Sequence, residues 1–118
     1  MTGDRGSASV YVLTAAAVSL LAGMAATVVG SAVVARHRAG AAADLGALAA
    51  ASSAHQGSGS ACAAARRVVR ANGARLAGCQ LTGADAVVIA AVSPTILGDE
   101  WGEARVTARA GPVDRPLS

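Results

Sequence analysis

An unbroken run of 29 uncharged residues, Ser7 to Ala35, most constrains this chain; it lies between Arg5 and the pair Arg36 and Arg38. A bilayer core needs roughly 20 apolar helical residues, so a helix over this run is long enough to cross a membrane. The apolar region of a secretory signal peptide covers only about 7 to 15 residues. The run therefore favours a retained membrane helix.

Two alternatives compete with a retained helix. A removed signal peptide is the first, because small residues occupy the positions that a signal peptidase reads before cuts after Ala41 or Ala43. A buried helix of a soluble protein is the second. It is the weaker one, because 118 residues with 32 Ala, 14 Gly and no Phe offer few large side chains to surround such a helix.

Small residues recur within the apolar run. Ala22, Ala26 and Gly30 form a small-xxx-small pattern, which lets helix backbones approach each other closely in lipid. The pattern predicts a face that packs against other helices.

The helical pattern continues past the apolar run to about Ala54, because residues 36–54 contain no Pro and are dominated by Ala. A helix over residues 7–54 has 48 residues and a length of about 72 Å at ~1.5 Å per residue. Its outer part has only Leu45 and Leu48 as large apolar residues, so it needs neighbours. The Gly- and Ser-rich residues 55–60 predict a linker.

Residues 61–111 predict a small module of one helix on a three-stranded antiparallel sheet, which makes the fold class α+β. Ala61 to Asn72 places apolar residues on one arc, and Gly73 is expected to end this helix as a left-handed cap. Alternation and Val-rich runs predict strands at 75–81, 84–92 and 103–110. Residues 1–6 are expected to be a short leader, and residues 112–118 a loose tail.

Two cysteines fall where they could staple this module. Cys62 lies on the apolar arc of the helix, and Cys79 lies in the first strand with Ala77 and Leu81 on its face. A disulfide would close a loop of 18 residues and stabilise it by roughly 3 kcal/mol. Two buried free thiols are the alternative. Two Cys without paired His cannot complete a tetrahedral metal site.

The cysteines and the flanking charges disagree about orientation. Arg36 and Arg38 after the span outnumber Arg5 before it, which by the positive-inside rule leaves the carboxyl half in the cytoplasm. A disulfide instead requires an oxidising compartment. We expect the amino terminus in the cytoplasm and the module outside.

The module's helix carries Arg66, Arg67 and Arg70 opposite its apolar arc. The simplest interpretation is a solvated face; contact with a partner is the functional one. Nucleic-acid binding is not expected, because aromatic stacking residues and a recognised motif are absent. His37 and His55, the only imidazoles, have no nucleophile or carboxylate at catalytic spacing, so we expect no enzyme, cofactor or small-molecule substrate.

Two segments carry a family resemblance. The opening Asp4-Arg5-Gly6-Ser7 with its long apolar helix, and the later run Ala42-Ala43-Asp44-Leu45-Gly46-Ala47-Leu48-Ala49, resemble the TadE/TadG-like proteins of the tight-adherence (Flp) pilus machinery. The chain is similar in particular to the short TadE-like branch of high-GC bacteria. The stretch from Cys62 to Cys79 also matches that branch.

The resemblance implies a pseudopilin or minor pilin, with a helix in the inner membrane and a small exported head. Pilin-type members are cut after a Gly that follows a short charged leader, here the Gly6/Ser7 bond. At the fifth position after this bond, pilins carry a Glu that pairs with a neighbour's new amino terminus, and this chain has Tyr11. TadG-like proteins keep an uncleaved anchor, so both fates are open.

The sequence thus predicts a pilin-like structural component of a Tad/Flp-type pilus or secretion system. Its expected partners are the lipid bilayer, other pilin-like subunits and components of the machinery, and it could enter a surface pilus. The alternative is a membrane-tethered binding module outside the cytoplasm, whose Arg-rich helix captures an anionic partner.

Overall fold

The computed structural model describes residues 3–94 and 102–112, with side chains from residue 6 onward. It consists of a helix α1 (Gly3–Ser52), a 3-10 turn η1 (Ala54–Gln56), a helix α2 (Ser58–Ala71) and strands β1 (Arg75–Thr82), β2 (Asp85–Val92) and β3 (Ala104–Ala110). The predicted α+β fold, with its long apolar helix, second helix and three-stranded antiparallel sheet, is confirmed.

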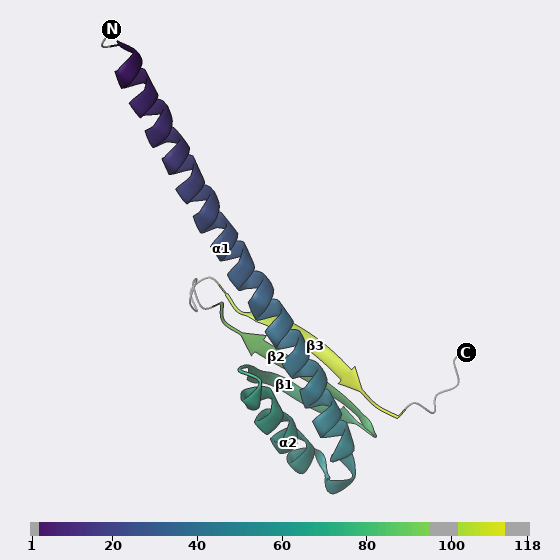
Figure 1. Cartoon of the computed structure of the whole chain (residues 1–118). Helices are drawn as coiled ribbons and strands as arrows, with labels where there is room; N and C mark the ends of the chain where they lie inside the picture. The colour runs from purple at the N-terminus through teal and green to yellow at the C-terminus, as the bar shows by residue number, and fades with distance from the viewer. Residues whose placement is uncertain (1–2, 95–101, 113–118) are drawn as a thin grey trace, which may run out of the picture.

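Helix α1 extends unbroken through both halves of the molecule. It contains 50 residues, about 75 Å at ~1.5 Å per residue, and the molecule is 84 Å long and 33 Å wide. Its amino-terminal half projects alone, and its carboxyl-terminal half lies against the sheet beside α2 (Figure 1). We call the part of the molecule built around residues 35–112 the head.

The connections around α2 follow from its glycines. Gly57, with a φ of 100°, precedes the helix, and α2 starts at Ser58, three residues earlier than the sequence suggested. At the other end, Gly73 has a φ of 75°. The Ala74 N–H donates to the Val69 carbonyl at 3.1 Å and the Gly73 N–H to the Arg70 carbonyl at 3.0 Å. These two bonds form a Schellman motif, in which Gly73 is the predicted left-handed cap.

The sheet has the strand order β1-β2-β3, and both pairings are antiparallel. A two-residue loop joins β1 to β2, and its first residue, Gly83, has a φ of 63°, a conformation that Gly adopts without steric cost. The segment between β2 and β3 includes Gly98, Asp99 and Glu100, which lie outside the described residues.

A bulge in β1 alters the predicted side-chain alternation. The register shifts between Leu76 and Gly78, so Ala77 is the extra residue. Because a bulge reverses the alternation, the β1 residues that pack on the core are Leu76, Cys79 and Leu81. The expectation that Ala77 shares a face with Cys79 is therefore wrong.

Two helices, rather than one, cover the inner face of the sheet. α1 contributes four residues to the main buried cluster, and α2 contributes Ala61, Ala65 and Val69. The four from α1 are Ala42, Ala43, Ala47 and Ala50. The second half of α1 is thus part of the head's core, so the head cannot be assembled from residues 61–111 alone.

The core is built almost entirely from alanine. Val69 and Val88 are its largest fully buried side chains. Small side chains let the helices lie close to each other and to the sheet, which compensates for the little apolar area that each residue buries.

The closest approach is at Gly46. A Cβ at this position would lie 2.7 Å from Val69 Cγ2 and 3.2 Å from Val88 Cγ1. Since carbon atoms in contact are normally about 3.5 to 4.0 Å apart, this point of α1 has room for glycine only.

Candidate functional site

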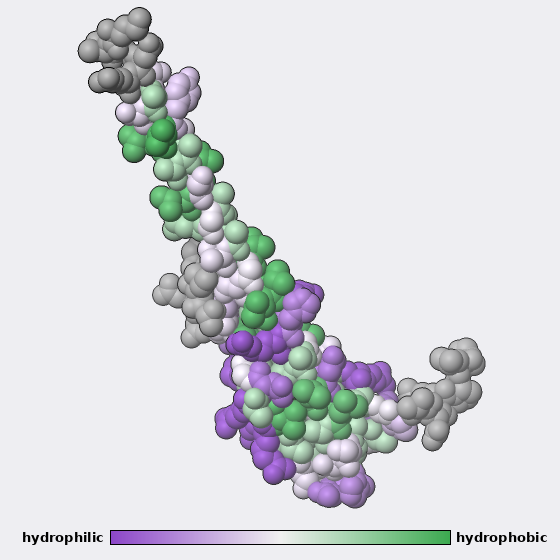
Figure 2. Space-filling model, in the orientation of Figure 1, coloured by the Kyte–Doolittle hydropathy of each residue, from purple (hydrophilic) through white to green (hydrophobic). Residues whose placement is uncertain are grey.

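The projecting half of α1 is an apolar surface that is almost entirely exposed. Side chains from Ser7 to Val34 are exposed, apart from half-buried Val28 and Ser31. This helix is the one candidate membrane span among the described residues, and none of its most apolar window is buried. Figure 2 shows hydrophobic side chains around this half of the helix. The large ones are Val10, Tyr11, Val12, Leu13, Val18, Leu20, Leu21, Met24, Val29, Val33 and Val34.

The hydroxyl groups of this half are mostly satisfied within the helix. Thr14, Ser19 and Thr27 each donate to the carbonyl four residues earlier, at 2.8 Å. An apolar solvent requires such internal pairing, because it offers polar groups no partner. The surface of this half is therefore suited to lipid.

Burial and charge change at the same place along α1. The first buried residue is Ala35, and Arg36 and Arg38 follow it directly. The bare apolar segment thus ends where the head begins. A head at the membrane surface would hold these two guanidinium groups at the level of the lipid headgroups.

Two of the three small residues predicted to form a helix-packing face line the same groove. Ala26 and Gly30 line a groove of about 540 Å³ beside α1, whereas Ala22 is exposed but is not a lining residue. The other lining residues are Gly23, Thr27, Ser31, Val34, Ala35, Arg38, Val92 and Ser93. No partner helix is present to test the packing prediction.

Gly6 and Ser7, the residues of the expected processing site, lie in the first turns of α1 and are exposed. Tyr11 is also exposed on this helix, at 75%. Their accessibility leaves both a cleaved and an uncleaved amino terminus open.

A disulfide joins α2 to the sheet. Cys62 and Cys79 are bonded, with Cα atoms 5.9 Å apart, a separation common for disulfides. The bond connects the first turns of α2 to the middle of β1, and neither cysteine is free.

Arg66, Arg67 and Arg70 are all exposed on the outer face of α2. Within the described residues none of them forms an ion pair. The structure places the three together, and this face is available to solvent or to a partner.

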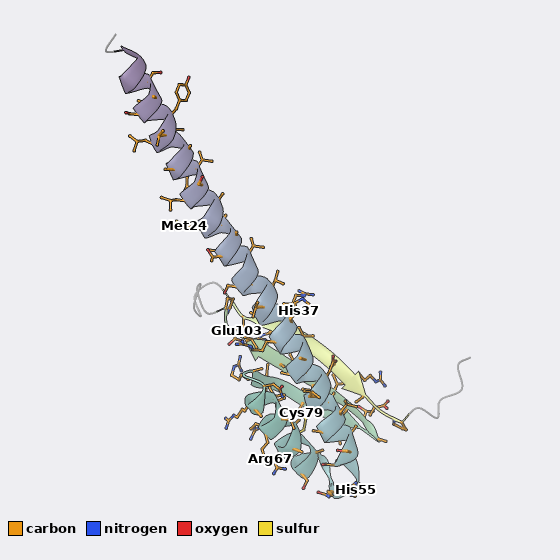
Figure 3. All side chains as sticks on the ribbon, in the orientation of Figure 1. Met24, His37, His55, Arg67, Cys79 and Glu103 are labelled. Carbon is orange, nitrogen blue, oxygen red and sulfur yellow. A yellow bond between two sulfur atoms is a disulfide. The ribbon has the colours of Figure 1, made fainter. Side chains whose placement is uncertain are left out.

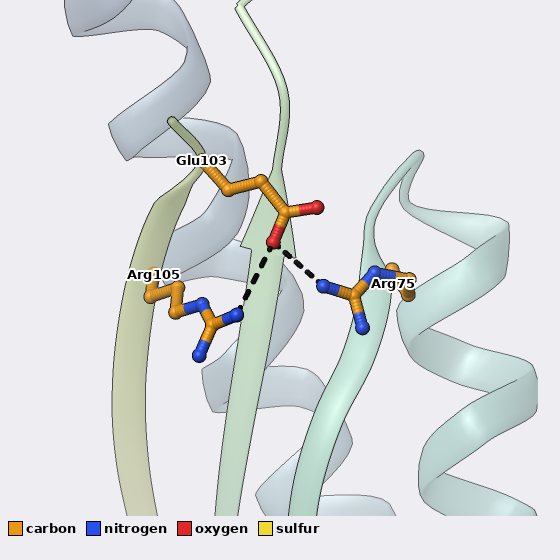
Figure 4. A network of polar contacts seen from close by, with 3 residues as sticks. All are labelled: Arg75, Glu103 and Arg105. Atoms are coloured by element: carbon orange, nitrogen blue, oxygen red, sulfur yellow. Dashed lines mark hydrogen bonds and ion pairs between the residues drawn. The ribbon is translucent and has the colours of Figure 1, made fainter. Parts of the chain in front are cut away.

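Sequence reasoning missed the polar network on the open face of the sheet. Arg75 donates to Glu103 Oε2 at 2.6 Å, and Arg105 approaches the same oxygen at 3.6 Å (Figure 4). Arg109 pairs with Asp85 on the same sheet. The opposite charges in and next to the strands were the available signal, but their use required the strand order and the register, which the sequence did not supply.

The two histidines are well separated in the structure. His37 lies where the projecting half of α1 meets the head, and His55 lies at the far end of the head (Figure 3). Among residues 6–94 and 102–112, no group of three or more His, Cys, Asp or Glu side chains could hold a metal ion.

The fold and its surfaces define a class: a membrane-length apolar helix that continues without a break into a small, disulfide-stapled α+β head. The match to a known family falls on that helix. Residues 6–53 match the TadE/G-like family of Flp pilus assembly, which confirms the resemblance for α1. The comparisons with curated proteins and with solved structures give no match.

Proposed function

We propose that the chain is a membrane-anchored, pilin-like structural component of a Tad/Flp-type pilus assembly or secretion system. The observation that carries this proposal is the bare apolar half of α1, within the segment that matches the family. An exposed apolar surface of this length requires lipid or neighbouring helices. A helix rooted in the head's core fits a subunit that is held by its helix and presents its head.

The proposed orientation has the amino terminus in the cytoplasm and the head outside. The Cys62–Cys79 bond supports it, because disulfides persist in oxidising compartments. A thiol reagent that cannot cross the bilayer, applied to intact cells before and after mild reduction, tests it. Labelling only after reduction is expected. Two free thiols shielded on the cytosolic side would refute the orientation.

Retention of the helix is favoured by the position of the core. Cuts after Ala41 or Ala43 would divide α1 between buried residues, since Ala39 and Ala42 are both fully buried. Removing the preceding residues would expose the packing surface of the sheet. A mature protein beginning near Ala42 would contradict the proposal.

Sequencing the amino terminus of the mature protein from membranes separates the two remaining fates. A start at Ser7 supports pilin-type processing after Gly6. A start at Met1 or Thr2 supports a permanent anchor. Tyr11, in place of the pilin Glu, favours the anchor, because a phenol lacks the negative charge that pairs with a new amino terminus.

The unpaired guanidinium groups on α2 support a second candidate, a tethered module that captures an anionic partner. Alanine replacement of Arg66, Arg67 and Arg70 distinguishes the candidates. Lost co-purification with pilus components favours the pilin-like role. Lost binding of a polyanion with intact co-purification favours the tether.

A further inference from the structure

Two hollows meet where α1 enters the head. The groove along the projecting half of α1 extends from Gly23 to Arg38, and it is mostly apolar. A second pocket, of about 470 Å³, is lined by Arg38, Arg75, Ser93 and Glu103 together with small and apolar residues of the head. Arg38, Val92 and Ser93 line both. An apolar groove thus continues into a charged pocket.

The dimensions of the groove match one leaflet of a bilayer. From Gly23 to Val34 the helix rises about 17 Å at ~1.5 Å per residue, and half of a hydrocarbon core is about 15 Å. Arg38 lies a further four residues along α1, about 6 Å, which corresponds to the headgroup layer. Along the helix axis, the groove is therefore about as long as the acyl chain of a phospholipid. When the groove lies within the hydrocarbon of one leaflet, the charged pocket lies in the layer of the lipid headgroups.

The charged pocket has an excess of positive charge among the described residues. Glu103 is its one carboxylate, and it is engaged by Arg75 and Arg105 (Figure 4). Arg38 has no ion-pair partner among these residues, and its Cδ lies 3.4 Å from the point where a Cβ on Gly73 would be. Contact with Gly73 positions the Arg38 stem, and its guanidinium can receive an anion.

The groove also contains an unpaired hydroxyl. Ser31 Oγ is buried and has no hydrogen-bond partner among residues 6–94 and 102–112, unlike the hydroxyl groups of Thr14, Ser19 and Thr27. It lies between the apolar end of the groove and Arg38. An ester carbonyl oxygen of a lipid occupies this depth and can accept its hydrogen bond.

We propose that this combined site holds one anionic phospholipid, with an acyl chain in the α1 groove and its phosphate at Arg38. The inference rests on the membrane insertion proposed above. A second copy of the chain is a poorer occupant, because α1 helices aligned at equal depth would bring a second Arg36 and Arg38 beside the first pair. Like charges at that distance repel.

The test uses the full chain, purified from membranes in mild detergent and incubated with phosphatidylglycerol or phosphatidylcholine of identical acyl chains. Native mass spectrometry counts the lipids retained. We expect one phosphatidylglycerol per chain and at least about tenfold less phosphatidylcholine, because the choline group adds a positive charge beside a pocket that already has an excess of positive charge.

Two variants and a matched control complete the design. Arg38→Gln should lower phosphatidylglycerol retention about tenfold. Arg109→Gln removes the same charge from an exposed site on β3, outside both hollows, and should leave phosphatidylglycerol retention unchanged. Gly30→Leu should displace the lipid by filling the groove, since a Cβ there meets nothing within 4 Å, and Leu suits a helix better than Gly.

Equal retention of the two lipids, equal effects of Arg38→Gln and Arg109→Gln, or undiminished retention in Gly30→Leu would each overturn the lipid site. A further test introduces the substitution Ala26→Cys. A disulfide-linked dimer that forms through this cysteine and retains no lipid would also overturn the lipid site. Carbonate extraction of the wild-type chain separates the two proposals: release from the membrane refutes the anchor, whereas a retained chain without bound phosphatidylglycerol refutes only the lipid site.

Discussion

Replacing glycine by alanine should have opposite effects on the stability of the head at two positions of the same helix. Gly40 and Gly46 both lie in the part of α1 that packs in the head. A Cβ at Gly40 would meet only Val106 Cγ1, at 4.0 Å, an ordinary contact. A Cβ at Gly46 would lie 2.7 Å from Val69 Cγ2 and would also press on Val88.

The magnitudes follow from two opposing terms. Replacing Gly by Ala in a helix stabilises it by about 1 kcal/mol. Gly40→Ala gains this amount without a clash. Gly46→Ala gains it too, but overpacking costs about 1 to 3 kcal/mol, because Val69 and Val88 are fully buried and have no space to move into. The two variants should therefore differ by about 1 to 3 kcal/mol.

Thermal unfolding of the full chain in detergent micelles, followed by far-ultraviolet circular dichroism, measures this difference. For a domain of the head's size, 1 kcal/mol corresponds to about 4 to 8 °C in Tm, so Gly40→Ala should melt at least about 4 °C above Gly46→Ala. Gly23→Ala, in the projecting half with open space around it, is the control for the head's melting. Equal shifts at positions 40 and 46 would refute the close packing at Gly46.

Four further changes test other parts of the head by the same melting experiment. Replacing both Cys62 and Cys79 by Ala should destabilise the head by about 3 kcal/mol; a smaller loss than 1 kcal/mol would show that the bond constrains little. Val69→Ala should cost about 2 kcal/mol, and Val68→Ala, at a half-buried neighbour, clearly less. Glu103→Gln breaks two ion pairs but should cost less than about 1 kcal/mol, because Arg75 and Arg105 are largely exposed; a larger loss would show a stronger network. Simultaneous Gln replacement of Arg66, Arg67 and Arg70 should change the free energy of unfolding by no more than about 1.5 kcal/mol, since each surface change stays within about 0.5 kcal/mol; a larger loss would reveal a structural role for these side chains.

The sequence predicted the elements better than it predicted their contacts. The strands were recognisable because β3 alternates between Ala or Val and charged or polar residues. The membrane helix was recognisable because 29 residues lack charge. Gly73 was identified as a cap because the residues after it begin a strand.

The place of α1 in the core was not predictable from its composition. Its buried face in the head consists of Ala and Gly residues, so this face does not stand out in the sequence as a stripe of large apolar side chains. The two largest apolar residues of this part, Leu45 and Leu48, are exposed at 44% and 60%. The positions of the large apolar side chains would therefore have led to the wrong choice of the buried face of α1. The bulge at Ala77 was equally hidden, because Ala77 and Gly78 are both small and fit either face.

Because one uninterrupted helix forms both the bare segment and a wall of the core, the molecule has no hinge between them. In the proposed membrane anchor, a tilt or twist of the head would be transmitted along the α1 backbone into the bilayer, and a rotation of the helix in lipid would turn the open face of the sheet with it. The protein should thus move as one rigid body. Its angle to the membrane should depend both on the contacts of the bare segment in lipid and on the contacts of the head.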